Sequence, residues 1–127
     1  MRFEMFDVIY ARINVPDGDH IQKKARPFIV CQNELGCINA PTLIVMPLTN
    51  QIKKMDMPTH TIIKKREENG LRDDSMVLAE QIFTIDKKAV ITKFGHIYNE
   101  KEQANICECY LANLYGKKKI KVNVVEG

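Results

Sequence analysis

Short apolar segments separated by turn-forming residues dominate this sequence and limit the folds open to it. Five such segments follow one another, at residues 6–11, 27–31, 42–49, 59–65 and 75–86. The first alternates as a strand with two differently used faces does, and the next two are continuously apolar, which is typical of buried strands. Asn69-Gly70 provides a turn signal between the last two segments. The pattern predicts a sheet of five or more short strands.

The stretches between these segments carry their own signals. Residues 16–25 contain a proline, a glycine and two aspartates, so an irregular loop is predicted there. Residues 33–41 are expected to form a loop or a single helical turn. Pro47 stands near the far end of the third segment, and proline is tolerated in sheets mainly on edge strands and at bulges. We therefore expect an edge or a bulge at that point.

One long helix is predicted, near the end of the sequence. Asn99 can cap its first turn, with Glu102 placed as in a capping box, and Gly116 is placed to end it. Four apolar residues recur at helical spacing and form one stripe, namely Cys107, Tyr110, Leu111 and Leu114. We expect this stripe to pack on the sheet.

Short strands followed by one helix predict a mainly β protein with a C-terminal helix, folded as a small, strongly twisted antiparallel barrel. A chain of 127 residues has room for one modest core, so we expect a single domain over residues 1–127. Residues 117–127 form a basic tail that then alternates in polarity. For this tail we expect either an added edge strand or a flexible arm.

Composition bears mainly on location and partners. Hydrophobic residues make up 45% and charged residues 28% of the sequence, as in ordinary soluble globular proteins. No apolar run approaches the roughly 20 residues that a membrane span needs, and the N-terminus lacks the features of a signal peptide. A cytoplasmic protein with no membrane partner is therefore expected. The net charge of +3 and the lysine and arginine clusters fit either a polyanion groove or a solvated surface.

The cysteines do not form a metal-binding pattern. Cys107 and Cys109 are separated by one residue, whereas zinc knuckles and redox pairs use a two-residue gap, and no histidine pair stands near them. In a cytoplasmic chain we expect these two, with Cys31 and Cys37, to be small buried side chains or free thiols. Neither a metal site nor another cofactor is predicted.

Five blocks, taken together and in order, carry a family resemblance. The first, HIQKKARPFIVCQN, sets Arg26-Pro27 before an apolar strand, and the second, APTLIVMPLTNQIKK, sets Thr49 at a strand end. The others are MPTHTII, DSMVLAEQIFTIDKK and KFGHI. From Asp7 to Tyr115 the chain resembles the MazF/PemK/Kid toxins of type II toxin–antitoxin modules. These toxins are metal-independent endoribonucleases, and they share a barrel fold with the CcdB plasmid-maintenance toxins.

The resemblance implies an activity and a set of partners. It implies sequence-specific cleavage of single-stranded mRNA without a metal, leaving a 2′,3′-cyclic phosphate (or a 3′-phosphate) and a 5′-OH end. It also implies a homodimer whose RNA groove runs across both subunits. A cognate antitoxin with an acidic, partly disordered tail would block that groove by folding on binding.

Residue roles follow from the resemblance and from side-chain chemistry. Arg26 is expected to hold the phosphate, because its planar, always charged guanidinium matches two phosphate oxygens. Thr49 is expected to donate its hydroxyl to the same phosphate. His20 is expected to share proton transfer near neutral pH, with a solvent-exposed loop histidine as the equal alternative. Six further residues are expected to contact RNA: Gln22, Lys24, Asn50, Gln51, Glu80 and Gln81. For the last two, pairing within the sheet or the dimer interface is an equal alternative.

Some positions depart from the family pattern. Phe6 replaces a glycine before Asp7, Ile21 replaces a glutamate, and Phe83 stands where arginine is common. Lysines at 23–24 replace small residues, which should stiffen a loop that normally moves over the RNA. One alternative is therefore a copy that binds RNA or antitoxin without cutting. A gyrase poison of the CcdB type is disfavoured, because its action depends on a C-terminal tryptophan and this sequence has none.

Overall fold

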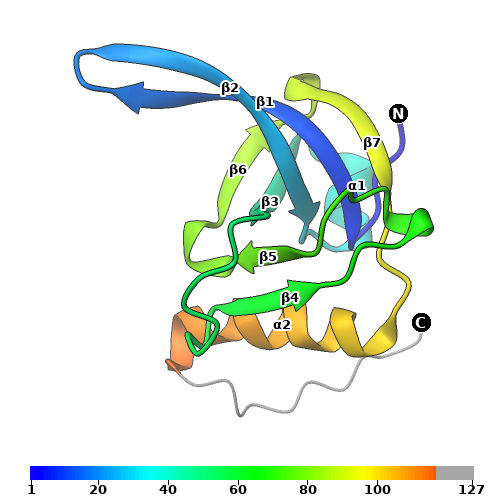
Figure 1. Ribbon diagram of the computed structural model, residues 1–127. Coiled ribbons are helices and arrows are strands. Elements are labelled where there is room, and N and C mark those ends of the chain that lie inside the picture. The colour runs from blue at the N-terminus through cyan, green and yellow to red at the C-terminus, as the bar shows by residue number, and fades with distance from the viewer. Residues whose placement is uncertain (117–127) are drawn as a thin grey trace.

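Two long strands form a hairpin that dominates the structure, a computed structural model that describes residues 1–116. Strands β1 (Asp7–Asp17) and β2 (His20–Val30) pair antiparallel as far as Asp17 and His20, on either side of a two-residue turn. In this turn Gly18 takes φ 61, the positive value that short hairpin turns require. Figure 1 shows the far end of the hairpin projecting beyond the other strands.

The prediction of an irregular loop at residues 16–25 is therefore wrong. Gly18 marks only the turn itself, and Val15 opposite Gln22 and Pro16 opposite Ile21 continue the strands. Proline is compatible with this position because β1 has no second neighbour there within residues 1–116. The expectations for residues 117–127 fall outside the described part of the chain, and a single domain over the whole length stays a prediction.

Five shorter strands complete the sheet: β3 (Thr42–Thr49), β4 (His60–Ile63), β5 (Ser75–Leu78), β6 (Phe83–Asp86) and β7 (Val90–His96). The strand order is β4-β5-β3-β2-β1-β7, and β6 pairs with β3 beside this path. The prediction of a mainly β fold with a C-terminal helix is confirmed. The sheet is not closed, however, because β4 and β7 end it without pairing to each other in the described residues.

Two details of the sheet differ from the sequence-based expectations. β3 is a central strand, and Pro47 lies where β3 changes partner, between the residues paired with β6 (42–45) and those paired with β5 (48–49). That change of partner explains how a proline is accommodated away from an edge. β7 was not among the predicted strands, because as an end strand it is mostly exposed and lacks a continuous apolar run.

The helices begin and end where local signals place them. In α1 (Glu34–Asn39) the side chain of Asn33 accepts a hydrogen bond from Gly36 N at 2.8 Å. In α2 (Glu100–Tyr115) Asn99 caps Glu102 N at 2.9 Å, and Gly116 ends the helix at φ 67. Both ends of α2 are thus as predicted. Within residues 1–116, neither helix combines the length and the apolar character needed to cross a membrane.

The buried face of α2 is not the predicted stripe. Tyr110 is 40% exposed and Leu114 is 73% exposed, whereas the buried residues are Glu102, Ile106, Cys109 and Ala112. This face includes polar anchors, since Glu102 bonds to the segment after β4 and Asn113 Nδ2 donates to Ala79 O at 3.0 Å. A search for apolar periodicity alone misses a helix face that is fixed at both ends by polar contacts.

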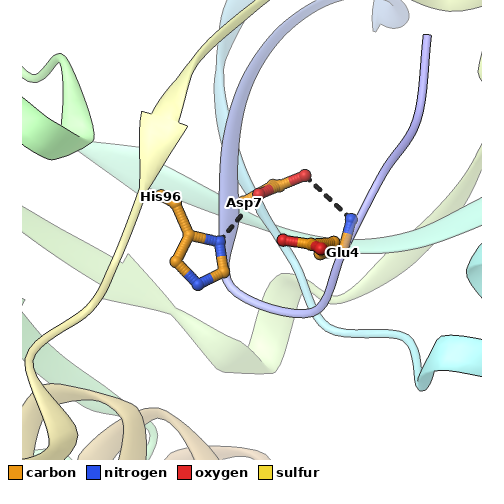
Figure 2. A group of neighbouring side chains, drawn as sticks. All are labelled: Glu4, Asp7 and His96. Carbon is orange, nitrogen blue, oxygen red and sulfur yellow. Dashed lines mark hydrogen bonds and ion pairs between the residues drawn. The ribbon is translucent and has the colours of Figure 1, made fainter.

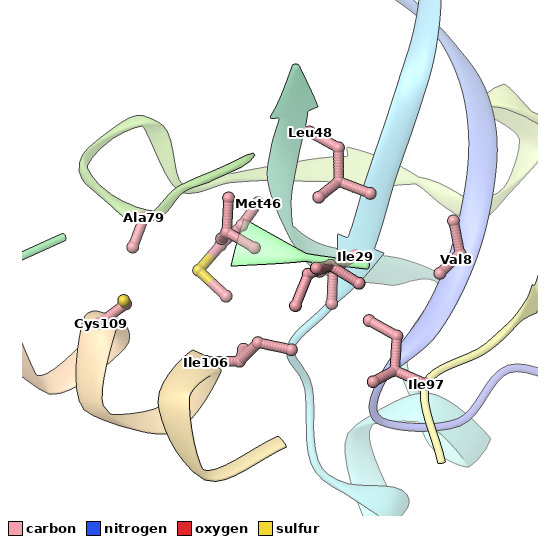
Figure 3. Close-up of a cluster of buried hydrophobic side chains, with 10 residues drawn as sticks. Val8, Ile29, Met46, Leu48, Ala79, Ile97, Ile106 and Cys109 are labelled. Atoms are coloured by element: carbon pink, nitrogen blue, oxygen red, sulfur yellow. The ribbon is translucent and has the colours of Figure 1, made fainter. Parts of the chain in front are cut away.

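Two apolar clusters cover the two faces of the sheet. One lies between the sheet and α2, where Ile106 and Cys109 meet Val8, Ile29 and Met46 (Figure 3). The other lies on the opposite face and consists of Phe3, Ile9, Ala11, Phe28, Val30, Cys37, Leu43, Val45 and Ile85. Neighbouring residues of β1 and β2 thus enter different clusters, which is the alternation that a strand imposes.

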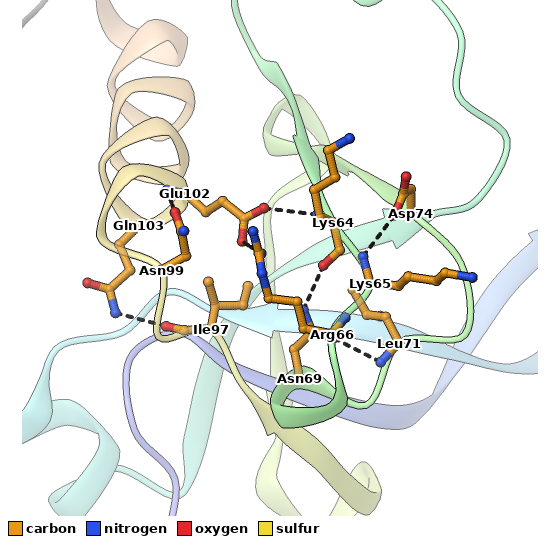
Figure 4. A network of polar contacts seen from close by, with 10 residues as sticks. All are labelled: Lys64, Lys65, Arg66, Asn69, Leu71, Asp74, Ile97, Asn99, Glu102 and Gln103. Carbon is orange, nitrogen blue, oxygen red and sulfur yellow. Dashed lines mark hydrogen bonds and ion pairs between the residues drawn. The ribbon is translucent and has the colours of Figure 1, made fainter.

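A polar network fastens α2 to the segment after β4 (Figure 4). Buried Glu102 accepts hydrogen bonds from Lys64 N at 2.9 Å and from the Arg66 guanidinium at 2.5 Å. Asn69 holds the same segment in a turn, accepting from Arg66 N at 3.1 Å and Leu71 N at 3.0 Å. This network fixes the chain between β4 and β5, which forms one wall of the site described next.

Candidate active site

The pairing of β2 with β3 brings Arg26 and Thr49 together. These strands pair as far as Phe28 opposite Pro47, and the same antiparallel register sets Arg26 opposite Thr49 just beyond the last pair. Arg26 Nη2 donates a hydrogen bond across this opening to Leu48 O at 3.2 Å. The two residues expected to contact the phosphate therefore lie side by side, and their roles stay predictions.

The Arg26 guanidinium is half-buried and held from below. It lies over the ring of Phe28, 5.9 Å from the ring centroid. Phe28 is in turn supported edge-on by Phe83, with ring centroids 5.4 Å apart. Burial lowers the pKa of Arg26 from its ordinary value, but arginine remains charged at neutral pH. Since one nitrogen is engaged by Leu48, the fork keeps further N–H groups for an anion.

The end of β3 provides neutral donors next to this charge. Thr49 Oγ1 accepts a hydrogen bond from Gln51 N at 3.1 Å, which orients the hydroxyl while leaving its own proton to donate. Asn50 Nδ2 lies 3.4 Å from Asp73 Oδ2 and links the end of β3 to the chain before β5. The site thus contains a fixed hydroxyl and an amide beside a cation.

An open cavity of about 770 Å³ is lined by Arg26, Thr49 and Asn50. Several other lining residues were not predicted from the sequence. Arg72 and Asp73 line it from the chain between β4 and β5, and Tyr10 and Phe94 line it from β1 and β7. Arg72-Asp73 belongs to a stretch that reads only as a turn. Tyr10 was assigned to a strand, and Phe94 sits in a strand that was not predicted, so no local signal placed them at the cavity.

The hairpin residues do not reach this cavity in the structure. The first residues of β2 are all exposed. Because side chains alternate along a strand, His20, Gln22 and Lys24 lie on the same face of β2 as Arg26. His20 begins β2, about 20 Å along the strand from Arg26 at about 3.3 Å per residue. Their roles in catalysis and RNA binding stay predictions, because within one chain only their common face links them to Arg26.

Glu80 and Gln81 lie on the short 3₁₀ turn η2 (Ala79–Gln81), outside the lining of the cavity. The Glu80 carboxylate bonds to His60 Nε2 at 2.9 Å, and His60 Nδ1 lies 2.9 Å from Lys54 O. The His60 ring thus joins η2 to the chain before β4. Burial raises the pKa of Glu80. The hydrogen bond with His60, a hydrogen bond from the backbone of Glu80 itself, and smaller contributions from Thr59 and the charge of His60 together outweigh burial and hold the pKa below its ordinary value.

Replacing Glu80 with glutamine should remove a pH-dependent part of the stability. A carboxyl whose folded-state pKa is depressed stabilises the fold above its unfolded pKa and loses that effect as the pH falls through the folded value. We expect wild type to exceed Glu80→Gln by about 1 kcal/mol or less near neutral pH, since the side chain is a third exposed. The difference should shrink below about pH 4.5, the ordinary value.

Urea unfolding at several pH values measures this difference, with Glu67→Gln as a control at an exposed carboxyl. A Glu80→Gln difference that stays constant down to pH 3 would contradict the role assigned to the His60 contact.

A second cluster of chemically capable side chains lies at the start of β1 (Figure 2). Buried Asp7 accepts hydrogen bonds from His96 Nδ1 and from Glu4 N, both at 2.8 Å, and Lys93 Nζ lies 3.2 Å away. Possible ligand atoms of Glu4, Asp7 and His96 fall within 4.8 Å of one another. The Lys93 ammonium already occupies this carboxylate, so the contacts fix the first strand against β7 rather than offering a cation site.

Phe6 keeps a backbone conformation that usually requires glycine. Its φ of 73 lies in the left-handed region, where a bulky residue is strained. Two backbone hydrogen bonds hold it there, from Phe6 N to Val30 O at 2.8 Å and from Ile97 N to Phe6 O at 3.0 Å. The aromatic side chain packs against the cluster under α2, so the departure from the family pattern adds apolar contact to the core.

Sequence comparison connects this arrangement with known proteins. Residues 4–111 match the family described as PemK-like, MazF-like toxin of type II toxin-antitoxin system. The chain is 39% identical over 94 residues to Endoribonuclease EndoA of Bacillus subtilis (strain 168), an alignment that spans 74% of this chain and 79% of that protein.

Solved structures have the same fold. An endoribonuclease in complex with its cognate antitoxin from Mycobacterial species aligns with a TM-score of 0.69 at 16% identity, over 88% of this chain and 94% of its own. MazE-MazF (Form-II) from Deinococcus radiodurans aligns with a TM-score of 0.67 at 14% identity, over 91% of this chain and 97% of its own. At such identities the likeness concerns the fold, and the sequence matches decide the family. The chain belongs to the PemK-like, MazF-like toxins of type II toxin–antitoxin systems.

Proposed function

We propose that this protein is a metal-independent endoribonuclease that cuts single-stranded mRNA at particular sequences. The observation that carries the proposal is the convergence of Arg26 and Thr49 on one open cavity. Family membership supports it, as does the 39% identity to a protein named as an endoribonuclease. The resemblance further supports an antitoxin as inhibitor, a homodimer as the active form and the cytoplasm as location.

The chemistry that fits this site is attack by the RNA's own 2′-oxygen on the neighbouring phosphorus. A P–O2′ bond forms, the P–O5′ bond breaks, and the products are a 2′,3′-cyclic phosphate (or the 3′-phosphate after hydrolysis) and a 5′-OH end. Arg26 would stabilise the additional negative charge on the phosphate oxygens, and Thr49 would donate a hydrogen bond to one of them. Both groups act by position and charge, and neither needs a metal ion to do so.

Two proton transfers complete the reaction. The 2′-OH must lose a proton and the departing 5′-oxygen must gain one. Asp73 is the carboxylate on the cavity wall and would accept the first proton. Arg26, which lines the same cavity and whose pKa burial lowers, would donate the second. His20 would take part only where the hairpin tip approaches a phosphate, as it would if RNA extends along β2.

The alternative is a copy that binds RNA or antitoxin without cutting. Two departures from the family pattern suggest it: Phe83, at a position where the family commonly has arginine, and the lysines at 23–24, in place of small residues. In this chain the Phe83 ring packs edge-on against Phe28, over which the Arg26 guanidinium lies, so the substitution helps to hold Arg26 in place. That observation favours the enzyme over the non-cleaving copy.

An RNA cleavage assay in excess EDTA tests the proposal. Wild type should cut a long mixed-sequence RNA into discrete fragments whose 5′-OH ends accept phosphate from polynucleotide kinase without prior phosphatase treatment. Arg26→Ala, purified in parallel, excludes a contaminating nuclease by failing to produce them. Salt-sensitive RNA binding by a folded wild type that cuts nothing at any concentration would replace the enzyme with the non-cleaving copy.

A further inference from the structure

A stacked pair of aromatic rings lies in the cavity beside Arg26 and Thr49. The rings of Tyr10, on β1, and Phe94, on β7, have centroids 5.2 Å apart and are inclined by 21°. Tyr10 pairs with Thr92, which makes Phe94 its diagonal neighbour on the adjacent strand. Both residues line the cavity, so an apolar, planar surface adjoins the cationic group that the proposed function assigns to phosphate.

This surface is exposed although an apolar core is available on both sides of the sheet. Phe94 is 38% exposed and Tyr10 is partly exposed. Most phenylalanines of this chain are better covered, and Phe28 is fully buried in the cluster on the opposite face from α2. A ring left open to a polar cavity gives up the stability that its full burial would add. The exposed position of Phe94 at the cavity therefore says more about its role than its being a phenylalanine does.

The backbone that carries Phe94 is held rigidly. A Cβ atom added at Gly70 would lie 2.3 Å from Phe94 O, and one added at Gly95 would lie 2.2 Å from Glu68 O. The turn after η1 (Glu67–Asn69) therefore packs directly on β7, with glycine on each side of the contact. Because the Glu102 network anchors this turn, the ring of Phe94 is fixed relative to the cavity wall.

The chemistry around the rings identifies the kind of ligand. Arg26 and Arg72 bring positive charge to the cavity, and Asn50 and Asp73 bring hydrogen-bonding groups to its rim. Charge for a phosphate, a flat aromatic surface and polar groups for a base edge are the features by which proteins hold unpaired nucleotides. An apolar peptide or lipid would leave these charges unpaired.

We propose that Tyr10 and Phe94 form a stacking surface for the base of a nucleotide adjoining the phosphate held by Arg26. The inference rests on single-stranded RNA being the substrate class and adds a base-binding subsite to it. Stacking accepts any base, so this contact contributes affinity and position, while Asn50 would contribute discrimination. Loss of either ring should therefore weaken binding of many sequences to a similar degree.

Binding to RNA that cannot be cut tests this subsite. The probe is a fluorescein-labelled pool of random 20-nucleotide RNA with 2′-O-methyl groups throughout, which removes the attacking hydroxyl. By fluorescence anisotropy, Phe94→Leu and Tyr10→Leu should bind about ten- to a hundredfold more weakly than wild type. Tyr10→Phe keeps the ring and should stay within about threefold. Tyr98→Leu, an exposed tyrosine outside the cavity, should bind as wild type does.

Photochemical cross-linking locates the contact independently of variant stability. The same pool containing 5-iodouridine is irradiated with wild type, and cross-linked peptides are identified by mass spectrometry. Cross-links to Tyr10 or Phe94 are expected whether or not the protein cleaves RNA, so failure of the nuclease proposal would not be mistaken for failure of this one. Cross-links confined to other residues, unchanged binding by folded Phe94→Leu, or no binding by wild type would each overturn the subsite.

Discussion

Replacing Arg26 with alanine is expected to lower kcat for RNA cleavage by about a hundred- to a thousandfold, the usual effect of removing one well-placed transition-state donor. The guanidinium is oriented by Leu48 O and the Phe28 ring, and Arg26 lines the cavity. Arg26→Lys keeps a charge but loses the planar fork, so it should recover only part of the activity. Initial rates on a defined cleaved oligonucleotide measure both.

Arg12→Ala provides the matched control. Arg12 is an exposed arginine on β1 that faces Ala25 and does not line the cavity, so its loss should leave kcat within about twofold if bulk charge is not what matters. Equal losses in Arg12→Ala and Arg26→Ala, or full activity in a folded Arg26→Ala, would contradict the role of Arg26. Thermal melting of each variant separates an effect on chemistry from an effect on folding.

Replacing Glu102 with alanine is expected to reduce the free energy of unfolding by about 2–3 kcal/mol. This is somewhat less than the roughly 3–5 kcal/mol for breaking a fully buried ion pair, because Arg66 is partly exposed. The change leaves Lys64 N and the Arg66 guanidinium without their acceptor. For a chain of this size the melting temperature should fall by about 10 °C. Urea unfolding and calorimetry measure the two quantities.

Glu100→Ala is the comparison for this variant, because Glu100 lies in the same helical turn but is exposed. Its loss should cost less than about 1 kcal/mol, since only its interaction with the helix dipole changes. Similar effects in Glu100→Ala and Glu102→Ala would show that charge near the helix N-terminus matters and the network does not. Glu102→Gln, which keeps the shape and one acceptor, should fall between them.

Local signals in the sequence predicted what depends on a few adjacent residues. Asn99 and Gly116 marked both ends of α2, because capping needs only a side chain or a positive φ at one position. β3 matched its apolar run from Thr42 to Thr49. Where long-range contacts decide, the sequence was less informative. Hydrogen bonds that join Glu102 and Asn113 to partners far away in the chain help to decide which face of α2 is buried.

The same distinction between local signals and long-range contacts applies to the candidate site. Arg26 and Thr49 were predictable through the resemblance, and strand register brings them together. Asp73 and Phe94 were not, since their place at the cavity depends on how the turn after η1 packs on β7. The hairpin was mistaken for a loop because Gly18 and its aspartates signal a turn without saying how far the flanking strands extend.

The projecting hairpin has a consequence for solubility. Beyond Ala11 on β1 and Phe28 on β2, the two strands pair only with each other within residues 1–116, so both edges of this ribbon offer unpaired backbone groups. Such edges invite strands from other molecules and lead to aggregation unless charged side chains oppose it. Lys23 and Lys24 lie along one edge, where their charge discourages edge-to-edge assembly whatever else it attracts.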